Sequence, residues 1–189
     1  MKEKLLLVGA GGFGRIVLEH AMQEFDCAFV DDGWETGKTV CGAPVVGHVS
    51  DLALLFDEYQ KLVVTVGNNA FREKIYAQAA HIGYSFPNII CKSAYISPFA
   101  RLGTGCVILN NAVVQNGAFV GNGALLNPGV EIHADAAVGD YALIYANSVV
   151  RTGASVGNRV RIGSNVTVGN RAKAADDSDI ADGAVLRKG

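Results

Sequence analysis

A glycine-rich motif near the start of the chain is the first candidate for chemistry. Gly9-Ala10-Gly11-Gly12-Phe13-Gly14 has the spacing GxGxxG, and it follows a short apolar run and opens a helix-like segment. Glycines in such a turn let backbone N–H groups approach a pyrophosphate at a helix N-terminus. Asp31 closes the next apolar run, where a carboxylate could hold a ribose or a base. The alternative interpretation is a tight strand-to-helix turn that binds no ligand.

Apolar runs and helix-like segments alternate over the first 90 or so residues and must position this motif. The pattern predicts strands at 4–8, 27–30 and 62–66 and helices at 15–24, 52–59 and 70–81. Asn68 or Asn69 would cap the last helix, and Gly83 would end it. Such alternation predicts a parallel sheet flanked by helices. A unit of this size lacks the six strands of a dinucleotide fold, so the motif favours a mononucleotide or a nucleotide-sugar, with a dinucleotide enzyme as an alternative.

The second half of the chain has a six-residue period from about Ile96. Aliphatic side chains fall at every sixth position, namely Leu102, Ile108, Val114, Val120, Leu126, Ile132, Val138, Ile144, Val150, Val156, Ile162 and Val168. Neither an α-helix nor an ordinary alternating strand has this period. Three hexads form one coil of a triangular prism, in which equivalent positions stack at about 4.8 Å. The twelve hexads predict four coils.

Small residues and turn formers recur in phase with these aliphatic positions. Glycine returns every eighteen residues, at Gly103, Gly121, Gly139 and Gly157. The position two residues after each aliphatic is often Asn or Asp, as at Asn110, Asn116, Asn122, Asp140, Asn158 and Asn170. Asn and Asp tolerate the left-handed backbone conformation best among non-glycine residues, so this position is expected to form the corners of the prism.

Composition excludes several classes of protein. The 189 residues are 50% apolar, which excludes a disordered chain, and the formal charge of −2 argues against binding to nucleic acid through its phosphates. No apolar run is long enough to cross a membrane, and the opening apolar stretch is too short for a secretory signal. The four cysteines, Cys27, Cys41, Cys91 and Cys106, lack CxxC spacing, so we expect reduced thiols, a cytoplasmic protein and no metal site.

Taken together, these motifs resemble one bacterial family over almost the whole chain. The matching segments are GAGGFG at 9–14, VDD at 30–32, VGNNAFREKIY at 66–76, KSAYISP at 92–98, the hexads, and AADDSDIADGAV at 174–185. The chain resembles the hexapeptide-repeat acyltransferases that N-acetylate nucleotide-linked amino sugars, and their sialic-acid O-acetyltransferase relatives. The resemblance implies a small Rossmann-like α/β domain at 1–92, followed by a left-handed parallel β-helix at 93–189. It also implies a homotrimer that uses acetyl-CoA.

The resemblance also assigns binding residues. It places the nucleotide-sugar against Gly11, Gly12, Phe13, Asp31, Asp32, Gly67 and Asn127. Phe13 departs from the histidine that is frequent at this position in the family. For acetyl-CoA, the matching positions are Leu143, Gly163 and Ser164. The basic, proline-containing C-terminal motif of the family is absent from this chain, which ends in VLRKG.

The catalytic histidine of the family has no direct counterpart in the chain. Acetyl transfer from a thioester needs a base for the nucleophile and donors for the oxyanion. In phase with the hexads, the histidine position of the family is Ala134 and the acidic position that orients it is Asp135, while His133 stands one residue earlier. The three remaining histidines lie in the first half and fit ordinary helix or loop positions.

We therefore expect His133 to act as the base and Asp135 to orient it. Arg151, one coil further on, would favour a neutral imidazole, whereas Asp135 would favour the charged form, and the sequence does not decide between them. The predicted function is acetyl-CoA-dependent N-acetylation of a nucleotide-linked amino sugar for surface glycans. The alternatives are a catalytically silent relative that binds a nucleotide-sugar, and a sugar O-acetyltransferase of the sialic-acid type.

Overall fold

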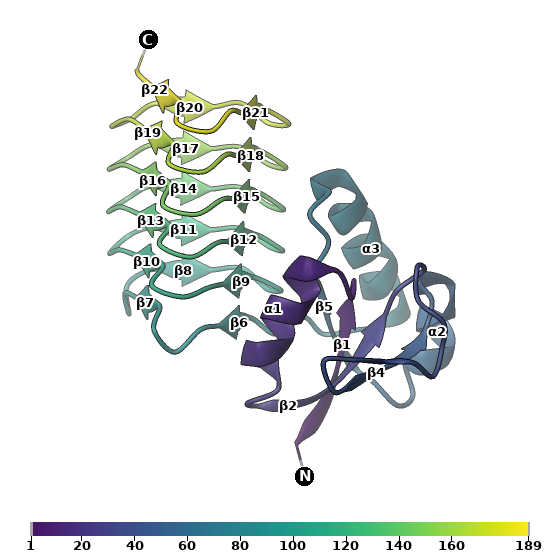
Figure 1. The fold of residues 1–189 in the computed structure, drawn as a ribbon. Coiled ribbons are helices and arrows are strands. Elements are labelled where there is room, and N and C mark those ends of the chain that lie inside the picture. The colour runs from purple at the N-terminus through teal and green to yellow at the C-terminus, as the bar shows by residue number, and fades with distance from the viewer. Residues whose placement is uncertain (1, 189) are drawn as a thin grey trace. The chain divides into compact units, whose positions relative to one another are not determined.

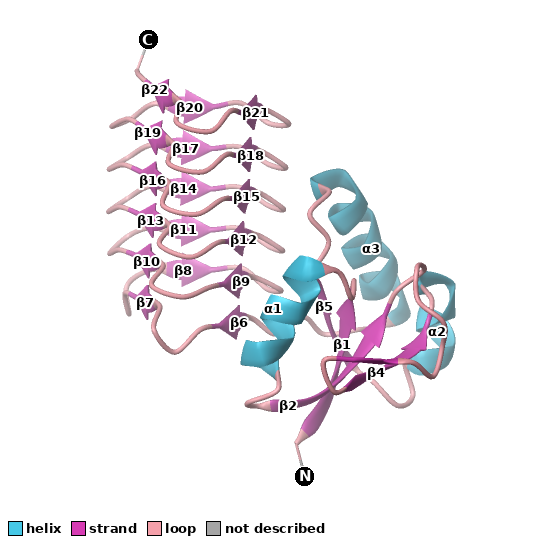
Figure 2. Ribbon diagram, in the orientation of Figure 1, coloured by secondary structure: helices cyan, strands magenta, loops and turns pink. Residues whose placement is uncertain are grey.

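The computed structural model describes residues 2–188 and divides them into two compact units, with the division between Ile89 and Ile90. The first is an α/β unit and the second a tall stack of short strands (Figures 1 and 2). Met1 and Gly189, the outer bounds of the two predicted domains, lie outside the described residues. An α/β unit followed by a left-handed parallel β-helix confirms the predicted fold class.

The α/β unit is built on one five-stranded sheet in the order β3-β4-β2-β1-β5. Its strands are β1 (Glu3–Val8), β2 (Phe25–Val30), β3 (Thr39–Val40), β4 (Ala43–Gly47) and β5 (Lys61–Val64). β1 pairs in parallel with β2 and β5, and β2 pairs in parallel with β4. Central β1 is buried on both faces from Leu5 to Val8, as expected for a parallel sheet covered by helices.

Three helices and one 3-10 turn accompany the sheet: α1 (Gly12–Ala21), η1 (Val49–Asp51), α2 (Leu52–Leu55) and α3 (Asn69–Ile82). α1 begins directly after the glycine motif, three residues earlier than predicted, and α2 is only one turn long. Asn68 caps α3, because its side-chain oxygen accepts from the N–H of Phe71 at 2.9 Å. Gly83 ends α3 in the left-handed conformation, with φ at +117°.

A hairpin at the sheet edge was absent from the prediction. β3 and β4 are antiparallel and joined by the two residues Cys41 and Gly42, with φ values of +49° and +87°. Positive φ at both central positions defines a type I′ turn, whose twist suits a two-residue hairpin. Cys41 is not a residue that this turn prefers, so no turn was predicted at this position.

The second unit is a prism of three parallel sheets, each stacking strands that lie eighteen residues apart. One sheet holds β7 (Tyr95–Ile96), β10 (Val113–Val114), β13 (Glu131–Ile132), β16 (Val149–Val150), β19 (Thr167–Val168) and β22 (Val185–Leu186). The next holds β8 (Arg101–Leu102), β11 (Phe119–Val120), β14 (Ala137–Val138), β17 (Ser155–Val156) and β20 (Lys173–Ala174). The third holds β6 (Ile89–Ile90), β9 (Val107–Ile108), β12 (Leu125–Leu126), β15 (Leu143–Ile144), β18 (Arg161–Ile162) and β21 (Asp179–Ile180).

The predicted aliphatic ladder forms the core of the prism. From Ile108 to Val168 every predicted aliphatic is buried, and the small residues two positions earlier, such as Ala112 and Ala136, are buried beside them. The coils extend beyond the predicted range at both ends, because Ile90, Ala174 and Ile180 continue the same phase. The prediction of four coils starting near Ile96 was therefore too short.

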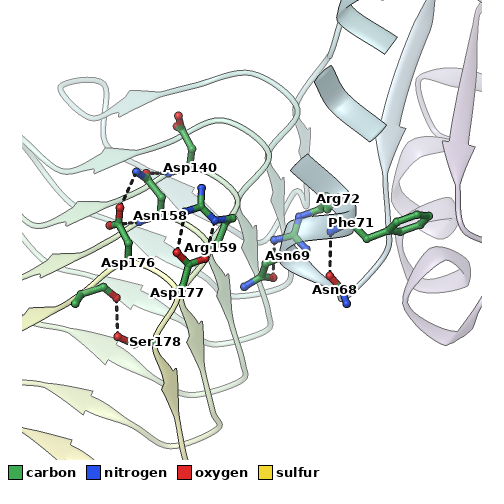
Figure 3. Close-up of polar contacts among 11 residues, drawn as sticks. Asn68, Asn69, Phe71, Arg72, Asp140, Asn158, Arg159, Asp176, Asp177 and Ser178 are labelled. Atoms are coloured by element: carbon green, nitrogen blue, oxygen red, sulfur yellow. Dashed lines mark hydrogen bonds and ion pairs between the residues drawn. The ribbon is translucent and has the colours of Figure 1, made fainter. Parts of the chain in front are cut away.

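The corners of the prism correct one detail of the prediction. The left-handed residue stands three positions after each aliphatic, not two, as at Asn111, Asp135 and Tyr141. Several Asn and Asp residues at the second position instead bond the neighbouring coil. Asp140 Oδ1 accepts from the N–H of Asn122 at 2.7 Å. Asn158 Oδ1 accepts from the N–H of Asp140 at 2.9 Å (Figure 3). These residues therefore connect adjacent coils and do not supply the positive φ.

No helix within residues 2–188 is long and apolar enough to cross a membrane.

Candidate functional site

The four glycines of the loop after β1 serve two different purposes. Gly9 has a φ of +110°, and a side chain at Gly14 would collide with the carbonyl oxygen of Gly9, so the fold itself requires both. Gly11 and Gly12 differ, because a Cβ added at either would meet no atom within 4 Å. Nothing in the packing of this chain explains these two glycines. A ligand that approaches the backbone at the start of α1 would explain them.

Asp31 and Asp32, at the carboxyl end of β2, hold backbone around the loop. The Asp31 carboxylate accepts from the N–H of Ala10 at 2.7 Å and from the N–H of Gly33 at 2.8 Å. Asp32 accepts from the N–H of Val49 at 2.8 Å. The sequence predicted a ligand role for Asp31, and the structure adds a positioning role, because its carboxylate fixes the glycine loop.

A cavity of about 180 Å³ opens beside these residues. It is lined by Val8, Gly9, Val30, Asp31, Asp32, Gly33, Val49, Val66 and Phe71. These residues come from the carboxyl ends of the parallel strands, from η1 and from the start of α3. Open α/β sheets bind ligands at the edge formed by the carboxyl ends of their strands. Its volume is below the roughly 300 Å³ of a small-molecule pocket, so it fits one ring of a ligand that extends beyond it.

The loop after β5 is held in place by a buried arginine. Arg72 is fully buried on α3, and it donates from Nη1 to the carbonyl oxygen of Val66 at 2.8 Å. It also donates from Nη2 to Asn69 Oδ1 at 2.9 Å (Figure 3). Gly67 lies within the loop that these bonds fix, and a Cβ added there would meet nothing within 4 Å. Gly67 therefore shares with Gly11 and Gly12 an open backbone that packing does not require. Sequence reasoning missed Arg72 because nothing in the pattern predicted its burial.

In the prism, His133 contacts a carboxylate that was not predicted. Its Nε2 atom lies 3.0 Å from Glu131 Oε2, and both side chains are partly exposed, at 25% for His133 and 47% for Glu131. Ile132, between them, is buried in the core. Residues two apart on a strand point to the same face, so Glu131 and His133 both point outward. This alternation was the signal that could have identified Glu131.

Asp135, the residue predicted to orient His133, lies at the following corner. Its φ is +58°, and its Oδ1 atom occupies the space where a side chain of Gly117 would lie, one coil earlier. The structure therefore brings Asp135 beside Gly117, and it brings Glu131 to the imidazole. Ala134 stands between, and its N–H donates to Gln115 Oε1 at 3.0 Å, which holds the corner to the preceding coil.

The remaining predicted residues lie on neighbouring coils. Asn127 donates from Nδ2 to the carbonyl oxygen of Ile144 at 3.1 Å, and Leu143 is buried on β15. A side chain at Gly163 would lie 2.6 Å from the backbone nitrogen of Asp182, so coil stacking alone requires this glycine. The N–H of Ser164 donates to Asp182 Oδ1 at 2.7 Å.

Within residues 2–188, no three His, Cys, Asp or Glu side chains stand close enough together to hold a metal ion. The four cysteines are free thiols, three of them buried. Burial raises the pKa of Cys27 to about 11 and that of Cys106 to about 12. Buried thiols with raised pKa values are poor nucleophiles, so neither is a candidate for covalent catalysis.

Both units match known families. Residues 4–79 match the model of the PglD N-terminal domain, and residues 135–170 match that of the bacterial transferase hexapeptide, six repeats. The matches fall on the glycine loop with its sheet and on the hexads that follow Ala134. The glycine loop and the hexads therefore each match a recognised family.

Solved structures extend the likeness to the whole chain. The acetyltransferase domain of PglB from Neisseria gonorrhoeae is 29% identical, with 98% of this chain and 92% of that chain covered and a TM-score of 0.92. The same domain in complex with acetyl coenzyme A is 30% identical, with 98% and 96% covered and a TM-score of 0.69. PerB from Caulobacter crescentus, in complex with CoA and GDP-perosamine, is 25% identical, with 98% and 97% covered and a TM-score of 0.60.

Proposed function

Because the chain belongs to the bacterial hexapeptide-repeat nucleotide-sugar N-acetyltransferases, we propose that it transfers an acetyl group from acetyl-CoA to the amino group of a nucleotide-linked amino sugar. The observation that carries the proposal is the likeness over 98% of the chain to an acetyltransferase domain whose structure contains acetyl-CoA. The GDP-perosamine bound to the Caulobacter relative supports a nucleotide-linked amino sugar as the acceptor. The product would be used for surface glycans.

The α/β unit, within 1–92, is the proposed binding domain for the nucleotide-sugar. Gly11, Gly12 and Gly67 offer exposed backbone N–H groups to the phosphates, and their lack of any neighbouring atom supports this role. Phe13, Asp31 and Asp32 complete the proposed acceptor contacts of this unit. Asn127, in the β-helix, is a separate proposed contact for the nucleotide-sugar. Asp31 and Asp32 line the 180 Å³ cavity, which suits one ring of the nucleotide.

The β-helix, within 93–189, is the proposed transferase domain, with His133 as the base. The sugar nitrogen attacks the thioester carbonyl, a C–N bond forms, and the C–S bond breaks as the tetrahedral intermediate collapses. His133 accepts the proton that the nitrogen loses, and the departing CoA sulfur takes up a proton to leave as the thiol. Leu143, Gly163 and Ser164 are the proposed contacts for acetyl-CoA. We further propose that the protein is a cytoplasmic homotrimer.

Ala134, at the family's histidine position, favours a second candidate function. A chain without a base would bind the nucleotide-sugar without turnover, as a catalytically silent relative. The two candidates differ in one measurable property, because only the enzyme releases CoA thiol when both substrates are present.

The experiment combines binding and turnover. Calorimetry measures binding of acetyl-CoA and of UDP- and GDP-linked amino sugars, and thiol release is followed for the wild type, His133→Ala and Ala134→His. We expect His133→Ala to lower kcat by about 10²- to 10³-fold, as loss of a general base does. His81→Ala, at an exposed position of α3, is the matched control and should leave turnover unchanged. If the wild type binds both substrates without turnover, and Ala134→His gains turnover, the protein is instead the silent relative.

A further inference from the structure

We propose that Glu131 is the positioning residue of this acetyltransferase: it holds the proton of neutral His133 on Nε2, so that Nδ1 takes the proton from the sugar nucleophile. The inference rests on the proposed function, in which His133 is the base. It assigns a role to a residue that the sequence analysis did not select. It also names the reacting nitrogen, which neither the sequence nor the family resemblance specifies.

The backbone holds both residues in a fixed register. The N–H of Glu131 donates to the carbonyl oxygen of Ser148 at 3.0 Å, and that of His133 donates to Val150 at 2.9 Å, both in the following coil. The carbonyl oxygen of Ile132 accepts from the N–H of Gln115 at 2.8 Å, in the preceding coil. Because the coils on both sides hold this strand, the outward side chains of Glu131 and His133 remain neighbours. The corner at Asp135 is not needed to keep them together.

The chemistry of the contact selects one tautomer. A carboxylate only accepts hydrogen bonds, and a neutral imidazole carries a proton on one nitrogen. The 3.0 Å contact between Glu131 Oε2 and His133 Nε2 is therefore a hydrogen bond only when Nε2 carries the proton. Nδ1 then holds the free lone pair that a base requires. No group within residues 2–188 forms a hydrogen bond with Nδ1.

The stacked columns provide a second, independent observation. In the column of Glu131 the other residues are Tyr95, Val113, Val149, Thr167 and Val185, so Glu131 is the sole charged member. By the same register, the column of His133 contains Gln115 and Arg151 in the adjacent coils. Glu131, the single carboxylate of its column, therefore lies in the same coil as His133, the single histidine of the other column. A ladder of structural residues would not require that coincidence.

Asp135 does not compete for the ring. The left-handed turn places its carboxylate beside Gly117, one coil away from the histidine. Asp135 and Glu131 therefore form a matched pair of test positions: both are acidic, both lie within two residues of His133, and one of them contacts the imidazole.

The test compares Glu131→Gln with Asp135→Asn in the full chain. Both changes remove a charge and preserve shape, but a Gln amide both donates and accepts, so it no longer dictates the tautomer. We expect Glu131→Gln to lower kcat about 10-fold at unchanged KM. Losses of activity of this size follow when the hydrogen-bond partner of a functional histidine is removed. Asp135→Asn should lower kcat less than Glu131→Gln does, because its carboxylate lies beside Gly117 and not at the imidazole.

A spectroscopic measurement separates positioning from a merely structural effect. In protein labelled with ¹⁵N-histidine, the signal of His133 is identified by its loss in His133→Ala. At a pH where the ring is neutral, the wild type should show a protonated Nε2 and an unprotonated Nδ1, and Glu131→Gln should show a mixture of tautomers. A protonated Nδ1 in the wild type would overturn the proposal.

The outcomes also distinguish this inference from the function on which it rests. If His133→Ala loses turnover but Glu131→Gln keeps it, the enzyme stands and the role of Glu131 is refuted. If Asp135→Asn loses turnover and Glu131→Gln does not, the family's arrangement applies. If His133→Ala retains full turnover, His133 is not the base, and the proposed mechanism fails together with the positioning role.

Discussion

The two units of this chain show functional residues in opposite ways. In the α/β unit each element occurs once, so a residue has no equivalent for comparison, and a functional position is recognised because packing does not explain it. Gly11, Gly12 and Gly67 are the proposed examples, because packing does not explain them. In the β-helix every position recurs each eighteen residues, so a functional residue should differ from the other members of its column. Glu131 and His133 differ in this way, which supports the roles proposed for them.

The same residue type therefore has different meanings in the two units. Gly139 in the prism is required by the neighbouring coil, whereas a Cβ added at Gly11, after β1, would meet open space. Stacking at the parallel-strand spacing leaves no room for a side chain at certain prism positions.

The largest effect is expected at a prism glycine. A Cβ at Gly139 would lie 2.6 Å from the carbonyl carbon of Gly157 and 2.7 Å from the nitrogen of Asn158, both backbone atoms that cannot yield cheaply. We expect Gly139→Ala to lower the free energy of unfolding by about 3 kcal/mol, or Tm by about 10 °C. Thermal unfolding followed by circular dichroism measures this. A wild-type Tm would show that the coils separate freely.

The matched glycine in the α/β unit should affect binding and leave stability nearly unchanged. Gly11 has φ of −70° and ψ of −171°, which alanine adopts without strain, and no atom lies near an added Cβ. Gly11→Ala should change stability by less than about 1 kcal/mol. It should raise KM for the nucleotide-sugar about 10-fold, because the methyl group occupies the proposed path of the phosphates. Steady-state kinetics measures both KM values, and the KM for acetyl-CoA should stay unchanged. If the KM for the nucleotide-sugar is also unchanged, the proposed phosphate contact is wrong.

A smaller effect is expected for the side chains that link coils. Asn158 accepts from the N–H of Asp140, so Asn158→Ala leaves that donor without its partner and should cost about 1 kcal/mol. Asn170→Ala is the control, since Asn170 has the same phase in its hexad and no side-chain hydrogen bond in the described part of the chain, 2–188. Denaturant unfolding of the two variants measures the difference. Equal losses would mean that the ladder contributes nothing.

The smallest effect is expected at the β3–β4 turn. Cys41 adopts a φ of +49°, and Asn-Gly suits a type I′ turn better than Cys-Gly, so Cys41→Asn should stabilise the protein by about 0.5 kcal/mol. A thiol reagent at pH 8 gives a second readout. Cys27, Cys91 and Cys106 are buried, and raised pKa values keep Cys27 and Cys106 protonated at this pH, so only exposed Cys41 should react rapidly in the wild type. Rapid reaction of the Cys41→Asn variant would contradict this.

Much of the fold was predictable from the sequence. Period-six aliphatics predicted the prism because burial repeats with the coil, and Ile108 to Val168 are all in the core. The prediction of the left-handed residue was wrong by one position, since Asn and Asp suit both the corner and the ladder, and residue type does not separate the two. The hairpin at Cys41 carried no turn signal, and only chain pairing revealed it.

The sequence by itself determined the repeat, the glycine loop and the coil that carries His133, because these follow from spacing along the chain. Only the tertiary structure decided which carboxylate reaches the imidazole. Glu131 shares the outward face of a strand with His133, while Asp135 lies beyond a left-handed corner that directs it to Gly117. The two acids are equally close in sequence, two residues from His133 on either side. Backbone geometry between them, and not their spacing, sets which one makes contact.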